Sequence, residues 1–138
     1  MAGHHTKDKG DLGVAKAFAD LVDKGFMVLF PATEHAPFDL VGYRDERFWR
    51  IQVKFRTMKR GTVNVVFQSA WADRHGTHLK PMDKTAIDLV CIYCPETDEC
   101  YYVQPSAFSG SVTLRVTPSL NNQTVNVLSA SNFRDLPL

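Results

Sequence analysis

The run from Phe48 to Arg56 constrains the fold more than any other part of the chain, because it alternates without a break. At the two-residue period of a β-strand, aromatic and aliphatic side chains share one face. The other face carries Arg50, Gln52, Lys54 and Arg56. Three cations and one amide are an unusual set for a strand that only meets water, so this face is a candidate functional edge.

A second strand with one carboxylate comes just before this run. Residues 37–43 are typical of a strand, with Asp39 near its start, and residues 44–47 form a charged turn. The two strands should therefore pair as an antiparallel hairpin. That pairing would bring the Asp39 carboxylate, the Gln52 amide oxygen and the Lys54 ammonium together. Such a set is suited to holding a divalent cation beside a phosphate.

Magnesium prefers oxygen ligands and keeps several waters, so one or two side-chain oxygens suffice to hold it. Asp39 is the first candidate ligand, Gln52 offers an amide oxygen, and the main-chain carbonyl of Val53 lies next to it. Mg²⁺, or Mn²⁺ in its place, would polarise a phosphoryl oxygen and lower the pKa of a bound water. Lys54 would stay protonated and either orient that water or offset growing negative charge.

The distribution of charge favours a polyanionic partner. The net charge of the 138 residues is only +1, but residues 44–60 carry seven Lys or Arg against two carboxylates. Residues 85–138 carry two Arg against five carboxylates. The basic region is centred on the hairpin, which favours a partner such as nucleic acid over a small neutral substrate. A solvated strand face is the alternative explanation of these cations.

The remaining pattern predicts a single mixed α/β domain, residues 1–138, around an antiparallel core. Residues 9–24 predict a helix whose buried stripe is Val14, Phe18, Leu21 and Val22 and which ends at Gly25. Residues 69–84 lack a clear period and predict a loop. Strands are predicted at 26–30, 62–68, 87–94, 100–103, 112–116 and 125–128, with a short helical turn at 105–108.

The motif residues also carry a family resemblance. Pro37-Phe38-Asp39 followed by Gln52-Val53-Lys54 resembles the signature of the PD-(D/E)XK nuclease superfamily, with glutamine in place of the second acid. The run from Lys9 to Lys16, followed by Lys24-Gly25-Phe26 and Pro31, resembles its group I intron-encoded homing endonuclease branch. The resemblance covers about residues 7–105 and leaves 106–138 as an assembly or DNA-contact extension.

The resemblance implies a restriction-endonuclease-like core of the αβββαβ type, with a central mixed sheet flanked by helices. It implies magnesium-dependent cleavage of double-stranded DNA to a 5′-phosphate and a 3′-hydroxyl. It also implies a homo-oligomer, a dimer or tetramer, because a chain of this size offers one nuclease site for two DNA strands.

A third carboxylate is the weak point of the predicted site. The branch often carries a glutamate on the first helix, and the residue that aligns with it here is Val14. Asp11, one turn earlier, is the candidate replacement, both as a metal ligand and as a catalytic residue. Asp11 is equally typical of a helix start, where it favours the macrodipole. Glu34, in the loop before Asp39, is another possible source of the carboxylate.

Cations outside the predicted metal site are candidates for DNA contact. Lys7 and Lys9 precede the predicted helix, and its N-terminus is a place that can hold a phosphate. A β-ribbon fits the major groove, where arginines read guanine edges. The predicted DNA-binding residues are Lys9, Arg56, Lys59, Arg60, Arg74, His75 and Lys80.

Three alternatives stay open at this point. A structure-selective nuclease such as a Holliday junction resolvase shares the predicted core, and Val14 in the glutamate position allows an inactive DNA-binding module. Pair spacing typical of zinc ligands also occurs at His75 and His78 and at Cys91 and Cys94. Cysteines three apart on a strand face opposite sides, which argues against a shared zinc ion. An odd number of cysteines, a polar N-terminus and no membrane-length apolar stretch predict a cytoplasmic protein.

Overall fold

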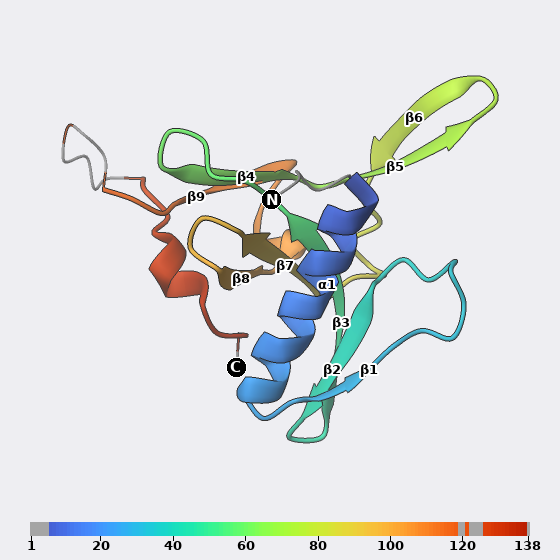
Figure 1. The fold of residues 1–138 in the computed structure, drawn as a ribbon, viewed down its shortest axis with the longest axis horizontal. Coiled ribbons are helices and arrows are strands. Elements are labelled where there is room, and N and C mark those ends of the chain that lie inside the picture. The colour runs from blue at the N-terminus through green and yellow to red at the C-terminus, as the bar shows by residue number, and fades with distance from the viewer. Residues whose placement is uncertain (1–5, 119–120, 122–125, 138) are drawn as a thin grey trace.

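The computed structural model describes residues 6–118, 121 and 126–137. Its centre is a five-stranded sheet, in which β3 and β7 pair in parallel and the other neighbours are antiparallel (Figure 1). In spatial order the strands are β1 (Met27–Leu29), β2 (Leu40–Arg44), β3 (Arg47–Phe55), β7 (Leu89–Cys94) and β8 (Glu99–Val103). The helix α1 (Thr6–Asp23) packs across one face of this sheet.

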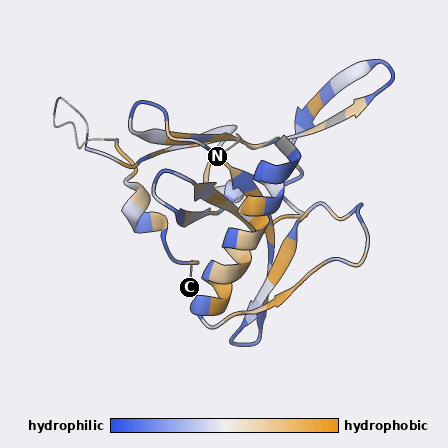
Figure 2. Ribbon diagram, in the orientation of Figure 1, coloured by the Kyte–Doolittle hydropathy of each residue, from blue (hydrophilic) through white to orange (hydrophobic). Residues whose placement is uncertain are grey.

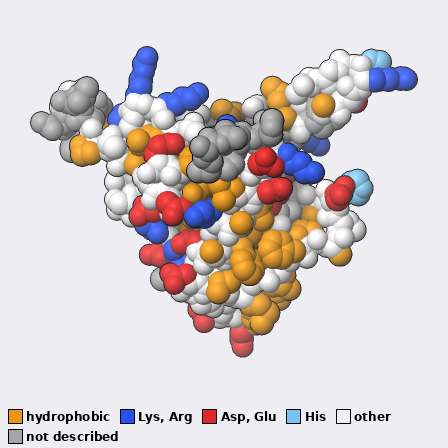
Figure 3. Space-filling model, in the orientation of Figure 1, with side chains coloured by type: hydrophobic (Ala, Val, Ile, Leu, Met, Phe, Trp, Pro, Cys, Tyr) orange, Lys and Arg blue, Asp and Glu red, His pale blue; other side chains and the backbone are white. Residues whose placement is uncertain are grey.

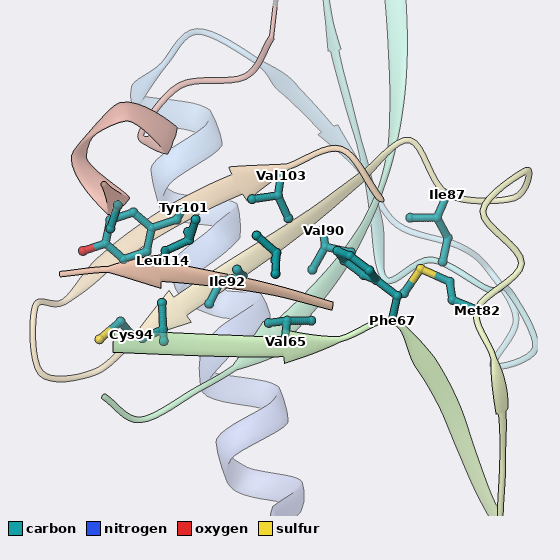
Figure 4. Packing of buried hydrophobic residues seen from close by; sticks show 13 residues of the cluster. Val65, Phe67, Met82, Ile87, Val90, Ile92, Cys94, Tyr101, Val103 and Leu114 are labelled. Atoms are coloured by element: carbon teal, nitrogen blue, oxygen red, sulfur yellow. The ribbon is translucent and has the colours of Figure 1, made fainter. Parts of the chain in front are cut away.

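A small second sheet covers the opposite face. It consists of β4 (Thr62–Val66) and β9 (Ser111–Arg115), with the short helices η1 (Pro105–Ala107) and η2 (Ala130–Phe133) after β8 and β9. Side chains that alternate along β7, such as Val90 and Ile92, meet Val65 and Leu114 in a buried apolar cluster (Figure 4). The described residues after 105 therefore form part of the same packed body.

The two remaining strands leave the core as an arm. β5 (Gln68–Asp73) and β6 (Gly76–Pro81) pair only with each other and project away from both sheets (Figure 1). Residues around the tip are polar, whereas apolar residues run along β1 and β2 (Figure 2). Residues 69–84 were predicted to be a loop, but most of them form this β-hairpin. Because both faces of the arm meet solvent, its sequence has no burial pattern to reveal the strands.

Helix α1 confirms the predicted helix but not its buried stripe. Gly13, Ala17 and Leu21 are the buried positions, whereas Phe18 and Val22 are 41% and 50% exposed. The cause is a close approach to β3, because a Cβ atom on Gly13 would lie 3.3 Å from Val53 Cγ1. Small residues thus face the sheet, and the larger apolar ones lie beside the contact.

The helix ends where predicted, in a Schellman motif at Gly25. Its φ is +87°, its N–H donates to the Val22 carbonyl at 3.0 Å, and the Phe26 N–H donates to the Leu21 carbonyl at 2.9 Å. The predicted hairpin between β2 and β3 is also present. Asp45 and Glu46 both have positive φ, as a two-residue turn between antiparallel strands requires.

The mixed sheet confirms the predicted fold class, with two departures in detail. The described chain has no α-helix between β3 and β7, where the αβββαβ pattern places one; β4, β5 and β6 fill this connection instead. Of the strand predicted at 125–128, Val125 lies outside the described residues and 126–128 are not in a strand. None of the described helices has the length and apolar character to cross a membrane.

Candidate active site

The β2–β3 hairpin places Asp39 against the middle of β3. Asp39 lies one residue before β2, and its N–H donates to the Ile51 carbonyl at 2.9 Å. Its carboxylate accepts a hydrogen bond from the Val53 N–H, with 2.7 Å between the nitrogen and Oδ2. The carboxylate is therefore held by the backbone beside both Gln52 and Lys54.

The environment of Asp39 disfavours its charged form. Desolvation by the surrounding protein raises the pKa of this carboxyl above its usual value, although the residue as a whole is exposed. The hydrogen bond from Val53 and the charge of Lys54 act in the opposite direction and are the smaller effects. A cation bound to the carboxylate would relieve this cost.

Gln52 provides an unpaired oxygen at the same place. Its Oε1 is the one buried side-chain nitrogen or oxygen of the described residues that has no hydrogen-bond partner. A buried acceptor without a partner costs about 1–3 kcal/mol, so such groups call for an explanation. A hard divalent cation takes oxygen ligands of this kind. The donor set of Asp39 and Gln52 thus fits a magnesium or manganese ion.

Lys54 lies on the same sheet face as Gln52, opposite α1. The register pairs Gln52 with Val90 and Lys54 with Ile92, both of which face away from the helix. Burial lowers the pKa of Lys54, the charge of Arg56 lowers it further, and the charge of Asp39 partly offsets both effects. The half-buried ammonium interacts with the Asp39 carboxylate through space without an ion pair between them.

The structure does not bring a third carboxylate into this set. Asp11 and Glu34 are exposed, and neither makes a hydrogen bond or ion pair with Asp39, Gln52 or Lys54. In the described part of the chain, no three His, Cys, Asp or Glu side chains cluster in a way that could hold a metal. The roles of Asp11 and Glu34 stay predictions.

Arg50, at the other end of the polar face, has a different environment. Its guanidinium makes two hydrogen bonds of 3.0 Å to Asp88, and its N–H donates to the same carboxylate at 2.8 Å. These bonds lower the pKa of Asp88. Arg50 is therefore a structural residue, although the alternation alone grouped it with Gln52 and Lys54.

The predicted DNA-contact residues fall into two groups. Lys9 lies in the first turns of α1, which begins at Thr6, and Arg56, Lys59 and Arg60 follow β3. Arg74 and His75 form the exposed tip of the arm, where cationic and histidine side chains are visible in Figure 3, and Lys80 is exposed on β6.

Three residues of the first group, Lys9, Arg56 and Lys59, line a hollow that the sequence did not predict. Its volume is about 400 Å³. Besides Lys9, Arg56 and Lys59, its lining includes Phe55 and the polar side chains of Thr57, Thr62 and Asn64. The polar residues gave no signal in the sequence, because they reach this place only when β4 turns back beside β3.

Comparison with known proteins identifies the family and the fold. The profile of the family described as PD-(D/E)XK endonuclease matches residues 4–136. A solved structure of a bacterial homing endonuclease, I-Ssp6803I, superposes with a TM-score of 0.75 at 20% sequence identity, covering 95% of this chain and 89% of that chain. No curated protein sequence matches. The resemblance predicted from the sequence is confirmed at the level of the family and of the fold.

Proposed function

Because this chain belongs to the PD-(D/E)XK endonuclease family, we propose that it is a metal-dependent, site-specific endonuclease of double-stranded DNA, with a homing endonuclease-like role. The observation that carries the proposal is the unpaired Oε1 of Gln52 beside the desolvated carboxylate of Asp39. Both groups carry an unfavourable free energy that a bound divalent cation relieves. The shared fold with a homing endonuclease supports the proposal.

The ligands of Mg²⁺, or of Mn²⁺ in its place, would be Asp39, Gln52 and the main-chain carbonyl of Val53. Asp11, in the second turn of α1, would complete the set if that part of the helix moves towards the hairpin. When bound, the cation supplies polarisation of the phosphoryl oxygen and acidifies a water. Lys54 then orients the attacking water and offsets the negative charge that grows on the phosphate. In-line attack leaves a 5′-phosphate and a 3′-hydroxyl.

The arm and the cations after β3 would hold the DNA. A two-stranded ribbon fits the major groove, and Arg74, His75 and Lys80 place hydrogen-bonding groups along it. Asp73 stiffens the tip, because its carboxylate accepts the His75 N–H at 2.7 Å and contacts a ring nitrogen of His78 at 3.0 Å. Arg60 would contact the DNA backbone at the turn after Lys59. We place this activity in the cytoplasm, where the three buried cysteines stay free thiols.

A second copy of the chain would supply the cut in the other strand. Hydrophobic side chains gather on the surface over α1 and the neighbouring edge strand β1 (Figure 3). They include Phe18 and Phe30, whose exposed rings stack at 5.7 Å, and Leu29. An apolar patch beside an unpaired strand edge favours self-association. Sedimentation of the purified protein tests this, and a monomer at micromolar concentration would contradict it.

The direct test of the proposed activity is a plasmid-nicking assay with Mg²⁺ or Mn²⁺. The wild type should cut, Asp39→Ala and Lys54→Ala should not, and Lys16→Ala, which removes a charge on α1 away from the hairpin, should cut normally. DNA binding without cutting in either metal would leave only the inactive DNA-binding module. Cutting that survives both substitutions would disprove the proposed site.

A second experiment separates the proposed specificity from that of a junction resolvase. Sequencing the ends produced from a randomised duplex library should reveal one recurrent target sequence. Cleavage of four-way junctions with no preferred sequence would instead assign the chain to structure-selective nucleases.

A further inference from the structure

The hollow beside β3 is built almost entirely from groups that bind anions. Its three charged lining residues, Lys9, Arg56 and Lys59, are all cations, and no carboxylate lines it. None of the three makes an ion pair within the part of the chain that the structure describes. Arg50 and Lys24 offer a contrast, because they are paired with Asp88 and Asp20. Charge in the hollow is thus left uncompensated.

Two segments supply the three cations: Lys9 comes from α1, and Arg56 and Lys59 come from the residues after β3. The Arg56 N–H donates to the Tyr93 carbonyl at 2.9 Å, and its guanidinium donates to the Phe55 carbonyl at 2.9 Å. Burial lowers the pKa of Arg56 from its usual range, as expected for a guanidinium partly removed from water. Lys9 reaches the hollow from α1, whose Gly13 packs against Val53 and Phe55.

Lys59 is positioned by a tight turn. Its N–H and carbonyl exchange hydrogen bonds of 2.8 and 3.0 Å with Thr62, while Arg60 and Gly61 between them have positive φ. A Cβ on Gly61 would lie 2.2 Å from the Thr117 hydroxyl oxygen, so this turn tolerates only glycine there. The turn therefore fixes where the Lys59 side chain leaves the backbone.

The hollow also adjoins the candidate active site. Phe55 and Arg56, both part of its lining, follow Lys54 directly in the chain. An anion in the hollow would lie beside the group proposed to act on the scissile phosphate.

We propose that this hollow is a binding site for one backbone phosphate of the DNA substrate, next to the phosphate that is cut. The proposal rests on the proposed function, since it takes DNA as the ligand. Lys9, Arg56 and Lys59 share that single phosphate and so set the register of the scissile bond over Asp39 and Lys54. Contacts of this kind position the protein without reading the sequence.

The test uses metal-free binding, which does not depend on cleavage. The affinity for a short duplex is measured at several salt concentrations for the wild type and for variants of the hollow. The variants are Lys9→Gln, Arg56→Gln, Lys59→Gln and the triple variant. Lys16→Gln, also on α1, is the matched control. Each lost phosphate contact lowers the slope of log K against log salt by about 0.9. A shared phosphate predicts that the triple variant loses about one such step in total, with Lys16→Gln unchanged.

Three outcomes overturn the proposal. The first is a slope for the triple variant that falls by about three times 0.9, which means three separate phosphates, and the second is an unchanged slope. The third is a triple variant that differs from wild type only in binding inorganic phosphate, which assigns the hollow to a free anion. On a duplex that the wild type cuts, a single neutral methylphosphonate should weaken wild-type binding most strongly at the position next to the cleaved bond. The affinity of the triple variant should be the same with and without the methylphosphonate. Wild-type protein that binds with the expected slope yet never cuts would refute the proposed function and leave this site standing.

Discussion

Two aspartates flank strand β3 in nearly the same way, and they differ in whether the protein neutralises their charge. Asp39 lies one residue before β2 and Asp88 one residue before β7, and each accepts a hydrogen bond from a β3 backbone N–H. Asp88 is also bound by the guanidinium of Arg50, and its pKa is lowered. Asp39 lacks such a partner, and its pKa is raised.

The comparison shows how one strand serves two purposes. At Asp88 the carboxylate is neutralised within the protein, so the pair contributes to the fold. At Asp39 the carboxylate accepts one backbone hydrogen bond but has no ion pair, and the oxygen of the neighbouring Gln52 has no partner. Such local conflicts are expected at functional sites, where stability is exchanged for chemistry.

The largest expected effect comes from removing the charge of Asp39. Asp39→Asn should lower the cleavage rate about a thousandfold or more, since metal-ion stabilisation of the transition state amounts to several kcal/mol. The matched substitution Asp88→Asn should change the rate less than about threefold at a temperature where the variant is folded. Single-turnover cleavage of a plasmid measures both, and equal losses would erase the distinction between the two aspartates.

A substitution of Gln52 tests whether its unpaired side-chain oxygen is a metal ligand. Gln52→Leu removes the unpaired oxygen, so Mn²⁺ affinity should fall about tenfold, or 1.4 kcal/mol, while the unfolding free energy stays equal or rises by up to about 1 kcal/mol. Calorimetric titration and urea unfolding measure the two quantities. A variant that loses stability while binding Mn²⁺ normally would show that Gln52 is a structural residue.

The two aspartates should also differ in their effect on stability at neutral pH. Asp88→Asn weakens the charge-assisted bonds to Arg50 and should cost about 1 kcal/mol of unfolding free energy, a small value because the pair is partly exposed to solvent. Asp39→Asn keeps an acceptor for the Val53 N–H and removes a desolvated charge, so it should leave the stability equal or higher. Urea unfolding compares the variants, and the reverse order would contradict the comparison.

The smallest effect is a pair of opposite pH dependences. The pKa of Asp88 is lowered, so its stabilisation is present above about pH 4 and is lost as the pH falls through the folded-state value. The pKa of Asp39 is raised, so its contribution is favourable in acid and is lost as the pH rises from about 4 through the folded-state value. Unfolding of each Asn variant and wild type from pH 3 to 7 should give differences of opposite slope.

The sequence predicted the β2–β3 hairpin well because two local signals agreed there. The alternation of Phe48–Arg56 fixes which side chains share a face, and the charged turn at Asp45–Glu46 fixes the pairing with the strand after Asp39. Together they place Asp39 beside Gln52 and Lys54 without any long-range information. The family resemblance rests on the same residues, and it was confirmed.

The parts that the sequence did not predict depend on distant contacts. Nothing local distinguishes Arg50 from Lys54, since the partner that neutralises Arg50 is 38 residues away at Asp88. The predicted buried stripe of α1 was wrong at Phe18 and Val22, which hydrophobic spacing had favoured. The close approach of the helix to β3 requires small residues, so Gly13 and Ala17 are buried instead. Assignment by size and hydrophobicity fails where backbones must come close.

The arm has a consequence for how this chain can change. It leaves the core at Phe67 and returns at Met82, both buried, and the Met82 N–H donates to the Phe67 carbonyl at 3.2 Å. The ends of the insertion are thus tied together by the core itself. The segment between them can therefore vary while β3 and β7 keep their register. Under the proposed function, the DNA-contacting arm can change without any change at Asp39, Gln52 or Lys54.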